Sequence, residues 1–109
     1  MKLTLNLDLD EKQQDELFDA FKRILWKSIN KMNEIAVKQV PVDTGRLKNS
    51  IRIEPFIPNQ NKYYLLTPVH YASHVEFGTI KQKAQPFFRP ALHEVANVHL
   101  RKYVNEEIN

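Results

Sequence analysis

The residue best placed to do chemistry in this sequence is an aspartate followed by a hydroxyl residue and a glycine. Asp43, Thr44 and Gly45 form this triplet near the middle of the 109-residue chain. Hydrolysis by such an aspartate needs a second carboxylate close enough to share one proton. The sequence holds one Asp-Thr-Gly triplet, so the second carboxylate would have to come from a second copy of the chain.

A dimeric aspartic protease using Asp43 is therefore an alternative, but the surrounding residues argue against it. The triplet directly follows a long predicted helix, whereas in such proteases it follows a strand. Arg46 stands next, where Ala or Ser would be expected, and the other glycine, Gly78, follows Glu-Phe and builds no second support motif. We interpret Asp43 or Thr44 as the cap of a short segment, 45–50, and Gly45 as the residue that permits a close turn.

The histidines do not have the spacing of a metal site. His70 and His74 lie four residues apart, while His93 and Glu94 precede His99 at a spacing of six, so neither pair forms His-Glu-x-x-His. If 70–74 is a strand, its two histidines share a face but lie too far apart to chelate easily. We expect surface or interface histidines, no metal, no cofactor and no enzymatic activity.

The net charge of +3 is unevenly distributed. The first 20 residues hold two lysines and six acidic residues, a balance of −4, whereas the remainder holds 14 basic and 7 acidic residues, a balance of +7. This asymmetry suits head-to-tail association or steering towards a polyanion, but we favour the simpler explanation of a mixed, solvated surface. Lys81 and Lys83, with Arg89 beyond them, are consistent with contact to DNA or an acidic partner, so a small nucleic-acid-binding module is a second alternative.

The first half of the chain predicts a strand and a long helix. Leucines alternate with polar residues from Leu3 to Leu9, which indicates a half-buried strand. Asp10 is a candidate N-cap for a helix that continues to Val40, where Pro41 ends it. Trp26 lies off the centre of the apolar stripe of this helix, so it either flanks the core or contacts a partner. The stripe consists of Leu17, Phe18, Phe21, Ile24, Leu25, Ile29, Met32, Ile35, Ala36 and Val40.

The second half predicts a hairpin, a polar loop and a last helix. Strands are expected at Ile51–Ile57, with Pro55 indicating an edge or a bulge, and at Tyr63–Tyr71. The loop Thr79–Gln85 contains no acidic residue, and a helix should begin near Pro90. One face of that helix would consist of Leu92, Val95, Ala96, His99 and Tyr103. The predicted class is α+β, a small antiparallel or mixed sheet packed by a long N-terminal and a C-terminal helix.

Composition fits one domain spanning 1–109. The hydrophobic content of 42% and charged content of 27% are typical of a globular chain. There is no cysteine, which excludes disulfides, thiolate zinc sites and a cysteine nucleophile. The N-terminal residues lack the apolar run of a signal peptide, and we expect a protein made and used without secretion.

Three dense segments follow one another in the middle and second half of the chain. They are Pro41-Val42-Asp43-Thr44-Gly45-Arg46-Leu47, then Tyr71-Ala72 with Val75-Glu76-Phe77-Gly78-Thr79, then Gln85-Pro86-Phe87-Phe88-Arg89-Pro90-Ala91-Leu92. In this order they resemble the tail-component family of long, flexible-tailed phages and prophages. The resemblance covers roughly residues 35 to 100, and the order of the three motifs makes it specific. Ser73-His74 stands where the family often has Pro-Tyr, and Phe88 where Leu is common.

The resemblance implies a non-catalytic head–tail joining or tail-completion protein. Such a protein would form a ring at the neck, contact the head connector and the tail terminator or tube, and touch DNA weakly and nonspecifically in the lumen. It would reside in the virion after a period in the host cytoplasm. Its motif residues would shape turns, and Lys81 and Lys83 would lie on a loop that is ordered by assembly and can face DNA.

Overall fold

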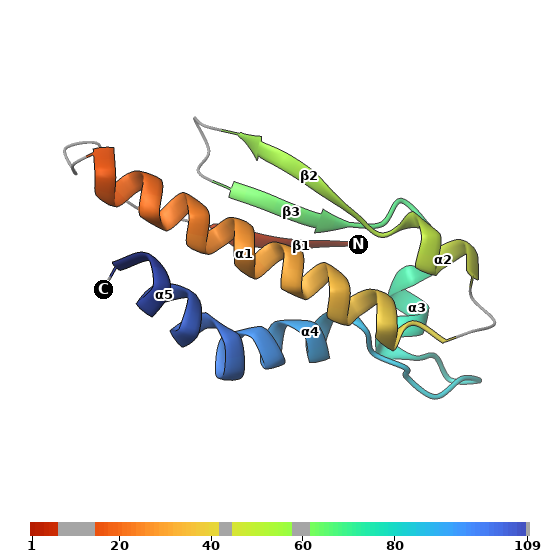
Figure 1. Cartoon of the computed structure of the whole chain (residues 1–109). Helices are drawn as coiled ribbons and strands as arrows, with labels where there is room; N and C mark the ends of the chain where they lie inside the picture. Colours follow the sequence, from red (N-terminus) through yellow and green to blue (C-terminus); the bar gives the residue numbers. More distant parts are fainter. Residues whose placement is uncertain (7–14, 42–44, 58–61, 109) are drawn as a thin grey trace.

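The chain folds as an α+β domain, as the sequence predicted, in a computed structural model that describes residues 1–6, 15–41, 45–57 and 62–108 (Figure 1). The order of strands and helices contains no repeated unit within the described residues. In chain order they are β1 (Lys2–Asn6), α1 (Asp15–Gln39), α2 (Gly45–Ser50), β2 (Arg52–Ile57), β3 (Lys62–Leu66), α3 (Ala72–Phe77), α4 (Phe88–Glu94), a π-helical turn η1 (Val95–His99) and α5 (Leu100–Ile108).

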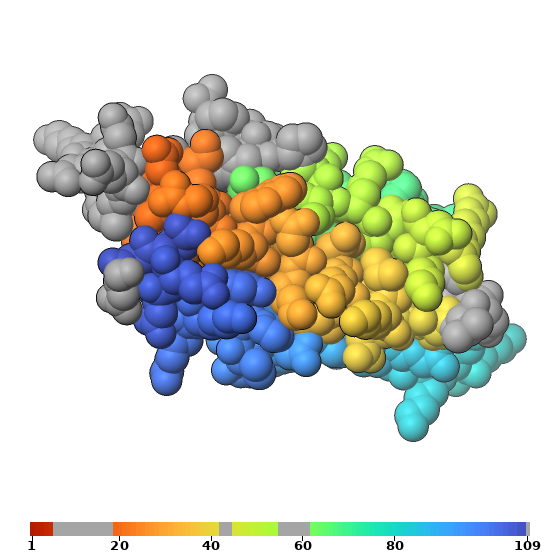
Figure 2. Space-filling model, in the orientation of Figure 1, coloured from red at the N-terminus to blue at the C-terminus, as the bar shows by residue number. Residues whose placement is uncertain are grey.

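Helix α1 forms the central layer of an elongated molecule. Figure 1 shows the sheet on one side of α1 and the run α4–η1–α5 on the other. The molecule measures 51 × 27 × 22 Å, and its long dimension follows α1 in the space-filling view (Figure 2). The start of α1 and the loop between α3 and α4 therefore lie at opposite ends.

The sheet is antiparallel with the order β1-β3-β2. Leu65 on the central strand pairs with Leu3 on one side and Ile53 on the other, so one row of apolar side chains crosses the sheet and packs in the core. The pairing of β2 shifts register between Glu54 and Ile57. Pro55 lies in this interval and cannot donate a ladder hydrogen bond, which confirms the predicted irregularity.

Helix α1 buries its predicted apolar stripe from Ile24 onwards apart from Leu25, which is partly buried like Phe21, while the side chains of Leu17 and Phe18 lie outside the described residues. Ile29 and Ala36 are completely buried and Met32 nearly so, because α1 is covered on two sides. The buried hydroxyl of Ser28 donates to the carbonyl of Ile24 at 2.8 Å and is thus satisfied. The helix ends at Gln39, just before Pro41, as expected. Its predicted start at Asp10 lies outside the described residues, as do Leu7 and Leu9 of the first strand.

The strand predicted over Tyr63–Tyr71 is too long. Strand β3 ends at Leu66, and a turn then leads into α3, which the sequence pattern did not predict. Pro68 explains the end of the strand, because a central strand needs N–H groups that proline lacks. The Thr67 hydroxyl accepts from the N–H of Val69 at 3.2 Å and redirects the chain.

The last helix begins at Phe88, near Pro90 as expected, and Pro90 is its third residue. Within it, η1 takes the wider π path, and the N–H of Leu100 bonds to the carbonyl of Val95. The extra residue in this turn rotates the remainder of the helix. The predicted face is wrong at Ala96, which is exposed, while the inward series is Phe88, Ala91, Leu92, Val95, His99, Tyr103 and Glu107, all buried or partly buried.

Candidate functional site

The most unusual side chain in the described structure is a completely buried carboxylate, that of Glu76 in the last turn of α3. Its Oε1 accepts from the backbone N–H of Phe87 at 3.0 Å and of Phe88 at 2.8 Å. Its Oε2 accepts from the backbone N–H of Arg89 at 3.2 Å. These donors belong to the start of α4, where N–H groups have no partner within the helix. The Glu76 side chain therefore caps the N-terminus of α4 from a different helix.

Arg89 closes the same network from the outside. Its Nε donates to Glu76 Oε2 at 2.9 Å and its Nη2 donates to the Glu76 carbonyl at 2.7 Å. Its guanidinium also lies over the Phe77 ring, 4.8 Å from the centroid, in a cation–π contact. The arginine side chain is about half exposed, whereas the glutamate is not exposed at all. Together they tie the second sequence motif to the third.

The environment keeps this carboxylate ionised. Burial by itself raises the pKa of Glu76, because it disfavours the charged form. The N–H groups of Phe87 and Phe88 and the two donors of Arg89 stabilise that form and outweigh burial, so the pKa lies below the ordinary value of a glutamate. A general acid or base acting near neutral pH needs the opposite shift. The carboxylate is thus arranged to hold two helices together.

Gly78, two residues after Glu76, has a backbone conformation that other residues adopt poorly. Its φ is +78°, and a Cβ built on it would lie 2.7 Å from the backbone N of Ala84. The chain then crosses back, and the N–H of Gln85 donates to the carbonyl of Val75 at 2.8 Å. A glycine is required here for both conformation and space.

Thr79 organises the tip of the loop that Gly78 begins. Its N–H donates to the carbonyl of Gln82 at 2.9 Å, and its own carbonyl accepts from the Gln82 N–H at 3.3 Å. Its hydroxyl accepts from the N–H of Lys81 at 3.2 Å and of Gln82 at 3.0 Å. We call residues 79–82 the Thr79 turn. Ile80 at this turn is fully exposed, and Lys81 and Lys83 are exposed beside it. The segment, cyan in Figure 2, stands out from the body.

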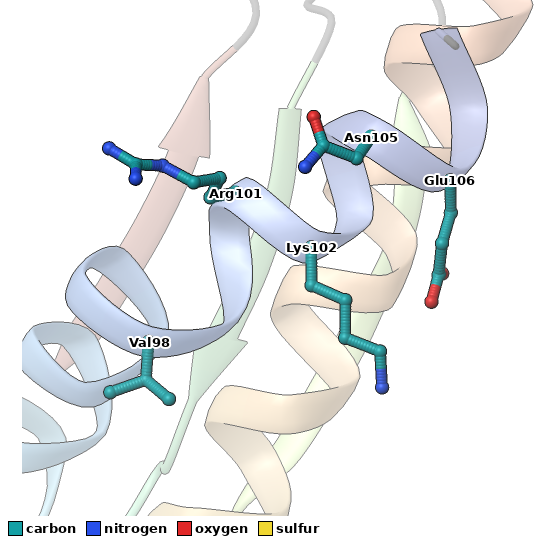
Figure 3. A pocket seen from close by; sticks show the side chains of 5 residues that line it. All are labelled: Val98, Arg101, Lys102, Asn105 and Glu106. Atoms are coloured by element: carbon teal, nitrogen blue, oxygen red, sulfur yellow. The ribbon is translucent and has the colours of Figure 1, made fainter.

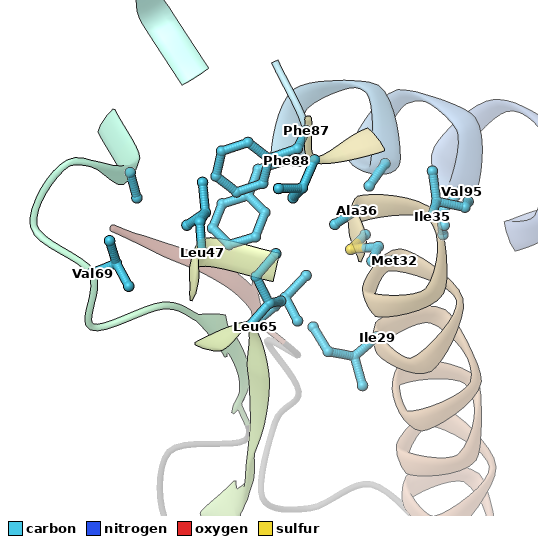
Figure 4. Close-up of a cluster of buried hydrophobic side chains, with 14 of the residues drawn as sticks. Ile29, Met32, Ile35, Ala36, Leu47, Leu65, Val69, Phe87, Phe88 and Val95 are labelled. Atoms are coloured by element: carbon cyan, nitrogen blue, oxygen red, sulfur yellow. The ribbon is translucent and has the colours of Figure 1, made fainter. Parts of the chain in front are cut away.

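The phenylalanines of the third motif belong to the core, as expected. Figure 4 shows Phe87 and Phe88 among the side chains of Leu47, Met32 and Leu65. Their ring centroids are 4.7 Å apart. Pro86 is half-buried just before them, and Pro90 lies in the first turn of α4, where its missing N–H costs no helical bond. The motif therefore anchors the loop on its C-terminal side.

The first motif is described only in part. Asp43 and Thr44 lie outside the described residues, so neither the capping interpretation nor the carboxylate pair is tested. Gly45 is the first residue of α2, and a Cβ built on it meets nothing within 4 Å. No positive φ is recorded for it, so the proposed need for glycine at this position is not supported. Arg46 is exposed next to it.

Other candidate groups do not converge. His70 lies in a turn and His74 in α3, not on a strand, and both are exposed. Across the described ranges, no cluster of three or more His, Asp or Glu side chains could hold a metal ion. Nor does any helix in those ranges have the length and apolarity to cross a membrane.

The described surface carries shallow hollows. One, of about 490 Å³, is lined by Val98, Arg101, Lys102, Asn105 and Glu106. Figure 3 shows these side chains spreading outward from one helical segment rather than converging. Two others, of about 300 and 370 Å³, lie on either side of Trp26. Trp26 is 48% exposed and its ring centroid is 5.6 Å from that of Tyr63, so it flanks the core and also presents an aromatic surface.

Comparisons with protein-family models, with curated proteins and with solved structures found no match to this chain. The geometry therefore carries the functional argument. Sequence reasoning singled out Glu76 as part of a motif but missed its role. One signal was available: Pro-Phe-Phe-Arg-Pro opens a helix without a local Ser, Thr, Asp or Asn to cap it.

Proposed function

We propose that this chain is a structural neck protein of a long-tailed phage or prophage, which joins head and tail or completes the tail by assembling into a ring. The proposal starts from the three ordered motifs. The observation that carries it is the Glu76 network, in which residues of the second and third motifs meet around one buried carboxylate. These motif residues support the architecture, and a reactive centre would arrange them differently.

The network also holds both ends of a projecting loop. Glu76 and Gly78 fix the chain where it leaves α3, and Phe87 fixes it where it enters α4. Between these points the chain presents an apolar tip and two lysines to solvent. A structural protein that works through its surfaces needs such a presented segment. Its partners in the proposed role are further copies of itself, the head connector and the tail terminator or tube.

The test is complementation of assembly. Particles made without the gene should contain separate heads and tails, and the purified wild-type protein should restore joined virions visible by electron microscopy. An Ile80→Ser variant, altered at the loop tip, should restore fewer virions than Ile108→Ser, altered at another exposed isoleucine. Heads and tails that join at the normal frequency without the gene would refute the proposal.

A nucleic-acid-binding module is the second candidate, because the loop end of the molecule is cationic. Lys81, Lys83 and Arg89 are exposed there, and the sequence from Phe77 to His93 contains no acidic residue. Binding of this kind falls steeply with salt, since it rests on phosphate contacts. A Lys81→Gln, Lys83→Gln variant should then bind duplex DNA with a shallower salt dependence. Absence of binding at low salt would remove this candidate.

A further inference from the structure

Helix α5 lies against α1 without contributing to the core. None of its nine residues is buried, and Leu100 and Ile108 are 38% and 47% exposed. By contrast, Phe88, Ala91 and Val95 in the preceding part of the same helical run are almost completely buried. A segment with few buried apolar contacts opens at a low cost in free energy. Helix α5 is therefore the part of this run that can leave α1 while α4 keeps its place.

Three ion pairs between described residues hold α5 on α1. Arg23 Nε lies 2.6 Å from Glu107 Oε2, and Lys27 Nζ lies 2.7 Å from Glu107 Oε1 and 2.9 Å from Glu106 Oε2. Tyr103 of α5 is partly buried at the edge of a hollow that is otherwise lined by α1. Surface ion pairs each contribute little stability and weaken in salt. The contact is thus specific in its charge pattern but weak.

The π-helical turn η1 joins the weakly held α5 to the firmly held α4. Turns of this wider kind are rare within helices and frequently lie at functional sites. Closing η1 to α-helical spacing, with every residue kept, would rotate α5 by about 100° and turn Glu107 away from the α1 of its own chain. Two arrangements follow, one with α5 docked on its own α1 and one with its carboxylates turned outward.

The surface that receives α5 is present on every copy of the chain. Arg23 and Lys27 of a second copy can pair with Glu106 and Glu107 as they do within one chain, because these ion pairs involve only α1 and α5. The structure thus shows what covers this face of α1, which is a helix with two adjacent carboxylates. Docking within one chain is favoured until neighbouring copies exceed its effective concentration of about 1 mM, as copies held side by side in a ring do.

We propose that neighbouring copies exchange α5, so that η1 opens and α5 of one copy docks on Arg23 and Lys27 of the next. Exchange of an identical element is a low-cost route to association, because the contact already exists within each chain. The donating and receiving surfaces differ, so successive exchange propagates into a closed ring or an open filament, whereas mutual exchange gives a dimer. This inference deepens the proposed function by naming the subunit contact, and it rests on that function for the purpose of the ring. The exchange itself can be tested on the isolated chain.

The absence of cysteine makes cross-linking site-specific. Lys27→Cys places a thiol on α1 and Glu106→Cys places one on α5, at the two ends of an ion pair of 2.9 Å, while Arg23 and Glu107 remain in both variants. A mixture of the two with a short bismaleimide should give little heterodimer at about 10 µM and about half heterodimer near 1 mM, the effective concentration of a short connection. The control mixture replaces Glu106→Cys by Glu94→Cys, which removes an exposed glutamate of α4.

Charge reversal tests the same exchange without a cross-linker. One chain carries Arg23→Glu with Lys27→Glu, and the other carries Glu106→Lys with Glu107→Lys, so each chain repels its own α5. Their mixture should form a heterodimer in size-exclusion chromatography with light scattering, because each α5 then meets opposite charge on the other chain. A chain with all four changes should be as monomeric as the wild type at the same concentration. Circular dichroism should show that the variants are folded, since none of these side chains belongs to the core.

Two results would overturn the exchange: a cross-linking yield near about 1 mM no greater than that of the Glu94→Cys control, or charge-reversed chains that stay separate when mixed. Failure here is distinguishable from failure of the proposed function. Complementation can succeed through a different subunit contact, and α5 can be exchanged in a protein that joins no heads to tails.

Discussion

Replacing Glu76 by glutamine tests whether the buried carboxylate holds the two helices together. The amide has the same shape and retains one oxygen, which can still accept from the N–H groups of Phe87 and Phe88. Its NH₂ group would replace Oε2, which now accepts from the Arg89 N–H at 3.2 Å and from its Nε at 2.9 Å. Donors would then face donors, and two charge-assisted bonds would be lost.

The expected cost of Glu76→Gln is about 2 kcal/mol, from roughly 1 kcal/mol or more for each lost bond. At about 4 °C per kcal/mol for a domain of this size, the melting temperature should fall by about 8 °C. Glu76→Ala would leave every donor unsatisfied and should cost about 4 kcal/mol. The matched control is Glu94→Gln, the same change at an exposed position of α4, which should stay within about 0.5 kcal/mol of wild type.

Acid pH gives an independent readout. The folded pKa of Glu76 lies below its unfolded value, so the stabilisation is complete above about pH 4.3 and is lost as pH falls through the folded pKa. The glutamine variant cannot titrate there. The difference in unfolding free energy between wild type and Glu76→Gln, measured by urea denaturation, should therefore shrink below about pH 4. A variant as stable as the Glu94→Gln control, or a difference that is independent of pH, would refute the reasoning.

Further predictions concern the glycines and the last helix. Gly78→Ala should cost about 2 kcal/mol or more in urea denaturation, because it combines a φ of +78° with a contact of 2.7 Å to the backbone N of Ala84. Gly45→Ala should be neutral or slightly stabilising, since alanine favours a helix and its Cβ meets nothing within 4 Å; a comparable loss for both would contradict this distinction. Arg23→Gln with Lys27→Gln should accelerate amide hydrogen exchange in α5, because those cations pair with its glutamates at 2.6 to 2.9 Å. About 1 M salt should raise the exchange rate of α5 in the wild type towards that of the variant, because salt screens the ion pairs. An exchange rate that responds neither to the substitutions nor to salt would show that other contacts hold α5.

The elements with strong local signals were predictable from the sequence. The stripe of α1 repeats every three or four residues, and Pro41 marks its end, so both were read correctly. The existence of β2 and β3 and the irregularity at Pro55 follow from alternation and proline chemistry, although the second strand was predicted to continue beyond Leu66, where it ends. The α+β class then required little more than counting these elements.

The missed features depend on distant partners. Helix α3 has six residues, too few to be stable by local propensity, and its position rests on Glu76 reaching α4. A glutamate two positions before a glycine looks solvent-exposed in sequence, because the donors that satisfy it lie 11 to 13 positions away. The loop tip was expected to be ordered by assembly, yet Thr79 already organises it within the chain.

The π-helical turn η1 makes the effect of a one-residue deletion in the C-terminal helix depend on where it falls. The turn is closed by the bond from the Leu100 N–H to the Val95 carbonyl, which spans one residue more than an α-helical bond. Deleting the exposed Ala96 would convert this bond to α-helical spacing, so α5 would keep the face that it turns towards α1. A deletion in α5 ahead of Glu107 has no wider turn to absorb it. Because an α-helix turns about 100° per residue, Glu107 would leave Arg23 and Lys27, and the apolar Ile108 would take its place.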